Sequence, residues 1–150
     1  MLTRLFPPRI DNVFPGIRLG LWLFVPHLAL RLLQGINSIV MTERVMVGAD
    51  GIPLATYPPD AAATAISLFA LLGADRLVIG AIGLVALVRY RAMIPLLYVL
   101  LLGEFLLKQG VLALRSPARE TTAAGTLVTA VLVSLMLTGL VLSLWRPRTA

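Results

Sequence analysis

Residues 122–145 read TAAGTLVTAVLVSLMLTGLVLSLW and contain no charged side chain. An apolar stretch of about 18 residues or more with few or no charges predicts a helix that spans the hydrocarbon core of a bilayer. This stretch alone is long enough to cross a membrane once, so we examine the rest of the chain for others like it.

Three further apolar stretches of similar length precede it, and the four expected spans are about 18–41, 61–88, 92–114 and 122–145. Of the 150 residues, 59% are hydrophobic and 13% are charged. A soluble domain is about 25% charged and would not bury such an apolar excess. The sequence therefore predicts one all-α transmembrane domain, residues 1–150, that forms an integral membrane four-helix bundle in the lipid bilayer.

The basic residues near the span ends predict the orientation, because cytoplasmic loops carry an excess of Lys and Arg. We expect both termini to be cytoplasmic and the loop 42–60 to be external. All basic residues but one are arginine, and the chain is rich in alanine and leucine, which indicates a bacterial source and hence the bacterial inner membrane. The expected cytoplasmic side carries Arg4, Arg9, Arg18, Arg89, Arg91, Arg146 and Arg148, whereas the other carries Arg44, Arg115 and Arg119.

The expected external loop contains a turn signal. Asp50-Gly51 lies between two runs of residues that favour strands, which is typical of a β-hairpin. Pro53 makes the second run an edge or irregular strand, because proline cannot donate a ladder hydrogen bond. The sequence therefore predicts a short β-hairpin-like loop between the first two spans.

Six ionisable side chains fall inside the expected spans, although each costs about 2.5–3.5 kcal/mol there even on lenient insertion scales. With a helical rise of 1.5 Å per residue, Arg31 and Asp75 both lie ~20 Å from the cytoplasmic ends of their spans, and Glu104 lies ~18 Å from its own. Opposite charges from three spans therefore share one level near mid-membrane. The six residues are His27, Arg31, Asp75, Arg76, Glu104 and Lys108.

The spacing suggests how these charges pair. Glu104 and Lys108 are four residues apart, so they share one helix face. We expect Asp75 to meet Arg31, and Arg76 to meet Glu104, with Lys108 sharing Glu104. One positive charge then remains, which would attract an anion, a polar headgroup or an acidic side chain of a partner. Three interpretations stay open: a structural network, a ligand, proton or ion site, and a contact with a partner subunit.

His27 is the only histidine, and the chain has no cysteine. A haem held by two histidines of this chain and an iron–sulfur cluster held by its thiolates are thereby excluded, and we predict no metal site. His27 is a candidate proton relay or axial ligand to a pigment or haem, or else a hydrogen-bond partner of a neighbouring helix. Quinone, lipid or pigment are the candidate ligands of His27 and the charged layer. We expect a polar stripe to face the bundle interior: Arg31, Gln34, Asn37 and Ser38.

The fourth span carries small residues at every fourth position, which permit close helix approach. They serve either packing within the bundle or a partner face. Three glycines of the second span offer a similar surface. Four aromatic residues near span ends are expected as interfacial anchors. The small residues are Thr126, Ala130, Ser134 and Thr138, the glycines are Gly73, Gly80 and Gly83, and the aromatic residues are Trp22, Tyr90, Tyr98 and Trp145.

In size, four spans, external first loop and polar residues within the first three spans, the chain resembles the small bacterial four-helix membrane proteins of the DoxX-like families. Its most distinctive stretch runs from Gly73 to Arg91. The resemblance implies a four-helix membrane fold. Some members of that group are linked to quinone-dependent oxidation of sulfur compounds. That activity is not carried over, because no site residue transfers position by position.

The sequence contains no nucleophile elbow, zinc-protease motif, phosphate-binding loop or dinucleotide fingerprint. We therefore expect a non-catalytic integral membrane subunit or scaffold that forms a homo-oligomer or joins other membrane subunits. The alternatives are an oligomeric proton-coupled transporter that uses Asp75 and Glu104, or a quinone-contacting oxidoreductase component that uses His27, Arg31 and Glu104. The basic residues behind the net charge of +6 flank apolar runs, so no nucleic-acid partner is expected.

Overall fold

The computed structural model describes residues 5–7, 9–115 and 122–145. Within these ranges the chain is helical and contains no strand. The prediction of an all-α chain with four long apolar helices is confirmed, since four of its helices are long and apolar enough to cross a membrane. They are α2 (Arg18–Val40), α4 (Pro59–Arg89), α5 (Ile94–Arg115) and α6 (Ala123–Leu144).

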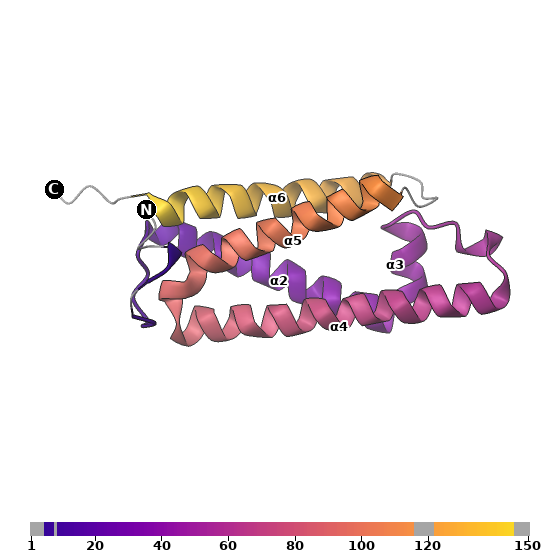
Figure 1. The fold of residues 1–150 in the computed structure, drawn as a ribbon, viewed down its shortest axis with the longest axis horizontal. Helices are drawn as coiled ribbons and strands as arrows, with labels where there is room; N and C mark the ends of the chain where they lie inside the picture. Colours follow the sequence, from indigo (N-terminus) through magenta and orange to yellow (C-terminus); the bar gives the residue numbers. More distant parts are fainter. Residues whose placement is uncertain (1–4, 8, 116–121, 146–150) are drawn as a thin grey trace.

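The four long helices run side by side along the long axis of the molecule (Figure 1). Helix α2 packs against both α4 and α6, and α5 packs against α6. The backbone N–H of Ile17 donates to the carbonyl of Leu142 at 3.1 Å, so the start of α2 adjoins the end of α6. After the short 3₁₀ turn η2 (Arg91–Met93), α5 leaves α4 and rises to follow α6 (Figure 1).

The core lies where the start of α5 meets α2 and α6. Tyr98 is fully buried there, and its hydroxyl donates to the carbonyl of Gly20 at 2.9 Å. Its ring packs edge-on against Phe24 and occupies the space that a Cβ on Gly139 would need. The expectation that Tyr98 is an interfacial anchor is therefore wrong, whereas Trp22 and Trp145 are exposed near helix ends.

Glycines allow α2 and α4 to cross closely. A Cβ on Gly73 would lie 2.9 Å from the Cβ of Ser38 and 3.0 Å from the carbonyl oxygen of Gly35. Gly80 and Gly83 lie against leucine side chains of α2 in the same way. The expected small surface of this span is thus the packing face between α2 and α4, as in other close helix pairs.

The small residues of α6 do not pack inside the chain. Thr126, Ala130, Ser134 and Thr138 are all exposed. The face of α6 that packs inward instead carries Met136 and Gly139, because Tyr98 fits against that glycine. Packing within this chain is therefore not the role of the small residues, and a partner face stays a prediction.

The segment 42–60 forms no hairpin, so that prediction is wrong. It contains helix α3 (Thr42–Gly48) and a 3₁₀ turn, η1 (Leu54–Thr56). Thr42 and Met46 are four residues apart and both buried, a helical spacing that outweighs the strand tendency of the run. Gly51 does make the expected turn, with φ of 65°, but the turn follows a helix. Helix α3 covers the end of the molecule opposite the start of α2 (Figure 1).

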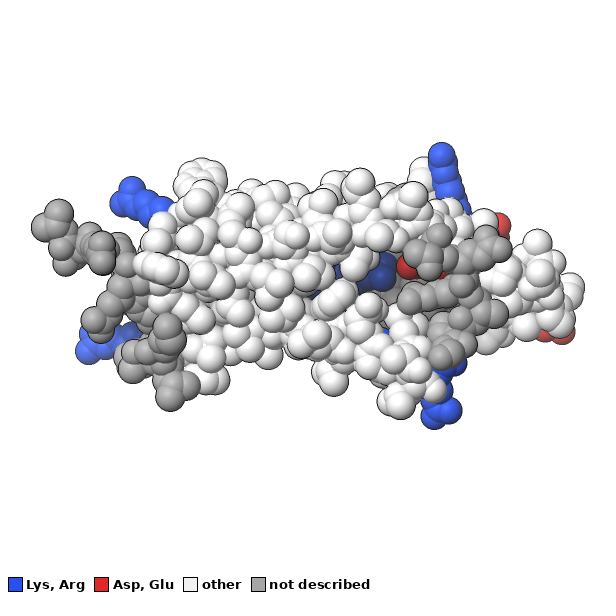
Figure 2. Space-filling model, turned by 90° about the horizontal axis from the view of Figure 1, so that it is seen from above, with Lys and Arg blue, Asp and Glu red and all other residues white. Residues whose placement is uncertain are grey.

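Charged side chains gather at the two ends of the molecule, and the surface between them is almost entirely uncharged on the face that Figure 2 shows. Many large apolar side chains are exposed along the long helices, among them Leu71, Leu107 and Leu114. A soluble protein rarely exposes apolar surface so continuously. This pattern is what a lipid environment favours around helices whose backbone hydrogen bonds are satisfied internally.

Candidate functional site

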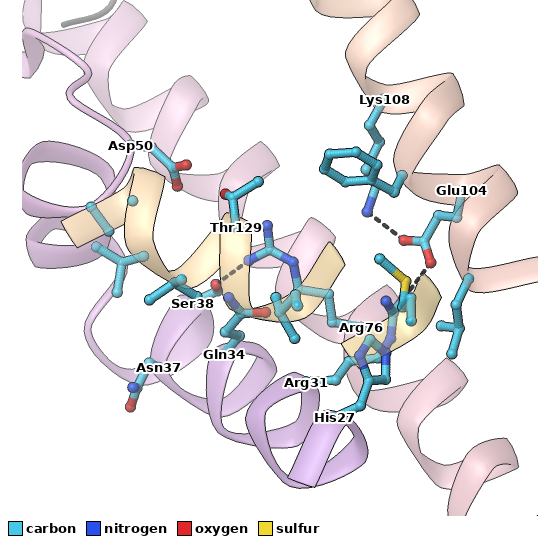
Figure 3. A pocket seen from close by; sticks show the side chains of 18 residues that line it. His27, Arg31, Gln34, Asn37, Ser38, Asp50, Arg76, Glu104, Lys108 and Thr129 are labelled. Atoms are coloured by element: carbon cyan, nitrogen blue, oxygen red, sulfur yellow. Dashed lines mark hydrogen bonds and ion pairs between the residues drawn. The ribbon is translucent and has the colours of Figure 1, made fainter. Parts of the chain in front are cut away.

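A polar cavity of about 340 Å³ lies among the helices, in the half of the molecule that α3 covers. Its lining residues come from α2, α4, α5 and α6 and from the segment of α3 and the turn after it. Figure 2 shows a hollow there, with basic and acidic side chains inside an otherwise uncharged surface. Its polar lining consists of His27, Arg31, Gln34, Asn37, Ser38, Asp50, Arg76, Glu104, Lys108 and Thr129 (Figure 3).

Glu104 of α5 is the centre of a three-residue ion network (Figure 3). Nη2 of Arg31 donates to Oε2 of Glu104, and Nζ of Lys108 donates to Oε1, each at 2.5 Å. The Arg31 side chain is 13% exposed and that of Glu104 22%, whereas that of Lys108 is 47% exposed. The expected pair of Glu104 and Lys108 is present, but Arg31 pairs with Glu104 and not with Asp75.

Arg76 of α4 has a different partner from the one expected. Its Nη1 donates to the hydroxyl of Ser38 at 2.7 Å, and its guanidinium lies 5.8 Å from the centre of the Phe69 ring. Within the described ranges, no carboxylate lies within 4.0 Å of its nitrogens. The expected pair of Arg76 and Glu104 is therefore wrong, because Arg31 and Lys108 already occupy both oxygens of that carboxylate.

Asp75 lies outside the cavity. It is exposed on α4 and forms no salt bridge or hydrogen bond with any residue that the structure describes. The reason is rotation about the helix axis, at about 100° per residue. Gly73 faces α2, so Asp75 points about 200° away, whereas Arg76 turns back towards α2. The glycine pattern of α4 was the signal that distinguishes the two neighbours.

His27 lies deep in the cavity wall. It is 2% exposed, and neither ring nitrogen has a hydrogen-bond partner among the described residues. The buried Nε of Arg31 is likewise unpaired in that part of the chain. A buried polar atom without a partner costs about 1–3 kcal/mol, so such atoms cluster where a site is built to hold another group.

Two cavity residues were not foreseen from the sequence. Asp50 follows α3, in a segment for which we expected a hairpin. Thr129 lies on a different face of α6 from the small residues at every fourth position, which the sequence pattern singles out. The polar stripe of α2 does border the cavity, with Arg31, Gln34 and Ser38 at least partly buried and Asn37 at its exposed margin.

The cavity is suited to holding a polar group and shows no metal-binding geometry. Across the described ranges, no three His, Asp or Glu side chains gather closely enough to bind a metal ion. The lining offers donors from Arg31, Arg76 and Lys108, together with the side chains of His27 and Thr129. A few convergent polar groups in a partly apolar wall are typical of ligand sites.

Comparison of the chain with protein-family models, with curated proteins and with solved structures finds no match.

Proposed function

We propose that this chain crosses the bilayer four times as a helical bundle and, without catalysing a reaction, binds the polar group of a ligand between its helices. The observation that carries the proposal is that the charged residues border a cavity. Charges that only fasten helices are best satisfied in a closed network, because each unpaired buried polar atom destabilises the fold. Here the ring of His27 and Nε of Arg31 lack partners in the described structure.

The bacterial inner membrane with cytoplasmic termini is part of the proposal, and the distribution of charge supports the orientation. Arg18 begins α2, Arg89 ends α4 and Arg91 begins η2, at the end of the molecule away from α3, where Arg9 also precedes the first span. Arg44 lies in α3 and Arg115 ends α5, at the opposite end. The excess at the first end favours the cytoplasmic side for it. Arg4, Arg119, Arg146 and Arg148 lie outside the described residues.

The geometry bears differently on the two alternative functions. A carrier that uses Asp75 and Glu104 would need both carboxylates on one path, yet Asp75 lies on the exposed face of α4 and Glu104 lines the cavity. The three residues of the quinone hypothesis, His27, Arg31 and Glu104, do border one cavity. A quinone head is thus among the ligands that the proposal admits, as is a lipid headgroup.

A cavity-filling variant tests the proposal. Thr129 and Thr138 are both exposed positions of α6, but of the two only Thr129 borders the cavity. After purification in mild detergent, native mass spectrometry of the wild-type protein and of Thr138→Phe should show a retained small molecule. Thr129→Phe should lose it, because the larger side chain occupies the space. Equal retention by Thr129→Phe, or no retained molecule on the wild-type protein, would contradict the proposal.

Asp75 favours a second candidate function, a subunit or scaffold within a membrane complex. Its carboxylate lies on an exposed face of α4 beside Leu71, Leu72 and Val78, which are exposed as well. A carboxylate in hydrocarbon is costly unless another group pairs with it. We propose that a basic or hydrogen-bonding side chain of a second copy or of another membrane subunit meets Asp75.

The mass of the protein in mild detergent, measured by light scattering, tests this second candidate. The wild-type protein should exceed the mass of one chain, and Asp75→Asn should shift it towards the monomer. Asp60→Asn, an exposed aspartate in the first turn of α4, is the control and should leave the assembly unchanged. A wild-type monomer without a co-purifying protein would contradict the second candidate.

A further inference from the structure

The cations of the described cavity lining are not all paired with a carboxylate. They are Arg31, Arg76 and Lys108, and Glu104 is the carboxylate to which two of them donate. A guanidinium stays charged inside proteins, and an uncompensated charge among membrane helices is unfavourable.

Two of the three cations are already paired with Glu104. Arg31 and Lys108 each donate to a different oxygen of that carboxylate. Arg76 is left with the neutral hydroxyl of Ser38 and the face of Phe69, which stabilises a cation only weakly. No described carboxylate lies within 4.0 Å of the Arg76 nitrogens. Among the described cations of the cavity, Arg76 is therefore the one without an anionic partner.

The guanidinium of Arg76 also has more N–H donors than the described groups around it accept. A guanidinium offers five N–H donors in a planar fork, and that fork matches the two oxygens of a carboxylate or a phosphate. Thr129 lies on the Arg76 side of the cavity, and the ring of His27, without a hydrogen-bond partner among the described residues, borders the same cavity beside Arg31 (Figure 3). His27 is 2% exposed, so its nitrogens are directed into the protein and not into lipid or water.

We infer that the cavity binds an oxyanion, a phosphate or carboxylate group, on the guanidinium of Arg76. This inference rests on the proposed function, because it names the ligand class of the same cavity. The cavity of about 340 Å³ is the size of a headgroup or a small metabolite, near the lower end for ligand pockets. The group belongs either to an anionic lipid or to a water-soluble anion, and the chemistry at Arg76 is the same.

Four probes in a neutral detergent test the inference and separate the sources: dihexanoyl phosphatidylglycerol, inorganic phosphate, dihexanoylglycerol without a phosphate, and a short-chain quinone. Thermal unfolding by circular dichroism and native mass spectrometry are the readouts. Phosphatidylglycerol or phosphate should bind, as seen by native mass spectrometry, and should raise the midpoint temperature of unfolding. Arg76→Gln should weaken that binding by about tenfold or more, because a charged hydrogen-bonded contact is lost.

Two further variants complete the experiment. Arg89→Gln removes an exposed arginine at the end of the same helix and should bind as the wild-type protein does. Arg76→Lys keeps the charge without the fork, so it should bind more weakly than wild type and more tightly than Arg76→Gln. It also serves as the test if Arg76→Gln does not fold, and binding by Arg76→Lys equal to wild type would then overturn the inference.

The outcomes separate the inference from the proposed function. Binding of phosphatidylglycerol alone, dependent on Arg76, identifies a lipid headgroup, and binding of free phosphate identifies a soluble anion. Binding of dihexanoylglycerol or quinone that Arg76→Gln leaves intact overturns the inference but keeps the cavity as a binding site. If no probe binds and no molecule co-purifies, both fail.

Discussion

Arg31 and Glu104 are 73 residues apart in the sequence and meet in a salt bridge of 2.5 Å that joins α2 to α5. Both helices also pack against α6, so the bridge closes the third side of that group. It lies on the cavity wall, where the surrounding apolar side chains weaken screening by water. This pair holds α5 in place on the side where it has left α4, and the shape of the cavity depends on it.

Glu104→Gln should destabilise the fold. The change leaves Arg31 and Lys108 without their shared counter-charge, and breaking a buried pair costs about 3–5 kcal/mol. Because Glu104 is partly exposed, we expect the lower end of that range, measured by denaturant unfolding in mixed micelles. Glu43→Gln, on the exposed surface of α3, is the matched control and should change little. Equal stability of the two variants would show that the network does not hold the helices.

Asp75→Asn should leave the isolated chain as stable as the wild type, within about 0.5 kcal/mol, which is usual for surface positions. The reason is that Asp75 is exposed and has no partner among the described residues. The same unfolding titration, carried out on monomer, measures it. A loss of stability as large as that of Glu104→Gln would show that Asp75 does belong to the ion network.

Gly73→Ala should separate α2 from α4. The new methyl group would lie 2.9 Å from the Cβ of Ser38 and 3.0 Å from the carbonyl of Gly35, and overpacking costs about 1–3 kcal/mol. Gly103→Ala in α5 is the control, because no atom lies within 4 Å of its added Cβ. The control should stabilise its helix slightly, since alanine favours helix over glycine. Thermal unfolding that ranks the two variants in the reverse order would contradict the close crossing.

Much of the architecture was predictable from apolar length alone. Each long helix begins and ends within a few residues of an expected span, because a run such as 122–145 has no other way to satisfy its backbone in lipid. The loop between the first two spans was not predictable in this way. Its Asp50-Gly51 turn is real, but the buried Thr42 and Met46 make the preceding run helical.

The sequence predicted how far along each helix the site residues lie, but not which way their side chains point. The helical rise correctly placed Arg31 and Glu104 at one level, and their contact confirms that level. It did not determine whether Asp75 or Arg76 faces the interior, since adjacent residues diverge by about 100°. Direction depends on which face of α4 packs against α2, and the glycines Gly73, Gly80 and Gly83 were the local signal for that face.

Single cysteines should reveal the orientation, because the native chain has none. Val47→Cys in α3 should react with a membrane-impermeant maleimide in intact cells. Val13→Cys, before α2, should react only after the membrane is permeabilised. Both valines are exposed, so accessibility within the protein is matched. Labelling of Val13→Cys in intact cells would reverse the proposed topology.

Spin labels on α6 test whether a cavity with polar residues lies among the helices that we propose cross the membrane. Thr129 and Thr138 each lie six residues from an end of α6, so both are ~9 Å deep along the helix. Both are exposed, but of the two only Thr129 borders the cavity. In a bilayer hydrated with D₂O, the deuterium modulation of an electron spin echo reports water at each label. We expect strong modulation at Thr129→Cys and weak modulation at Thr138→Cys, whereas equally weak modulation at both would show that no hydrated cavity lies there.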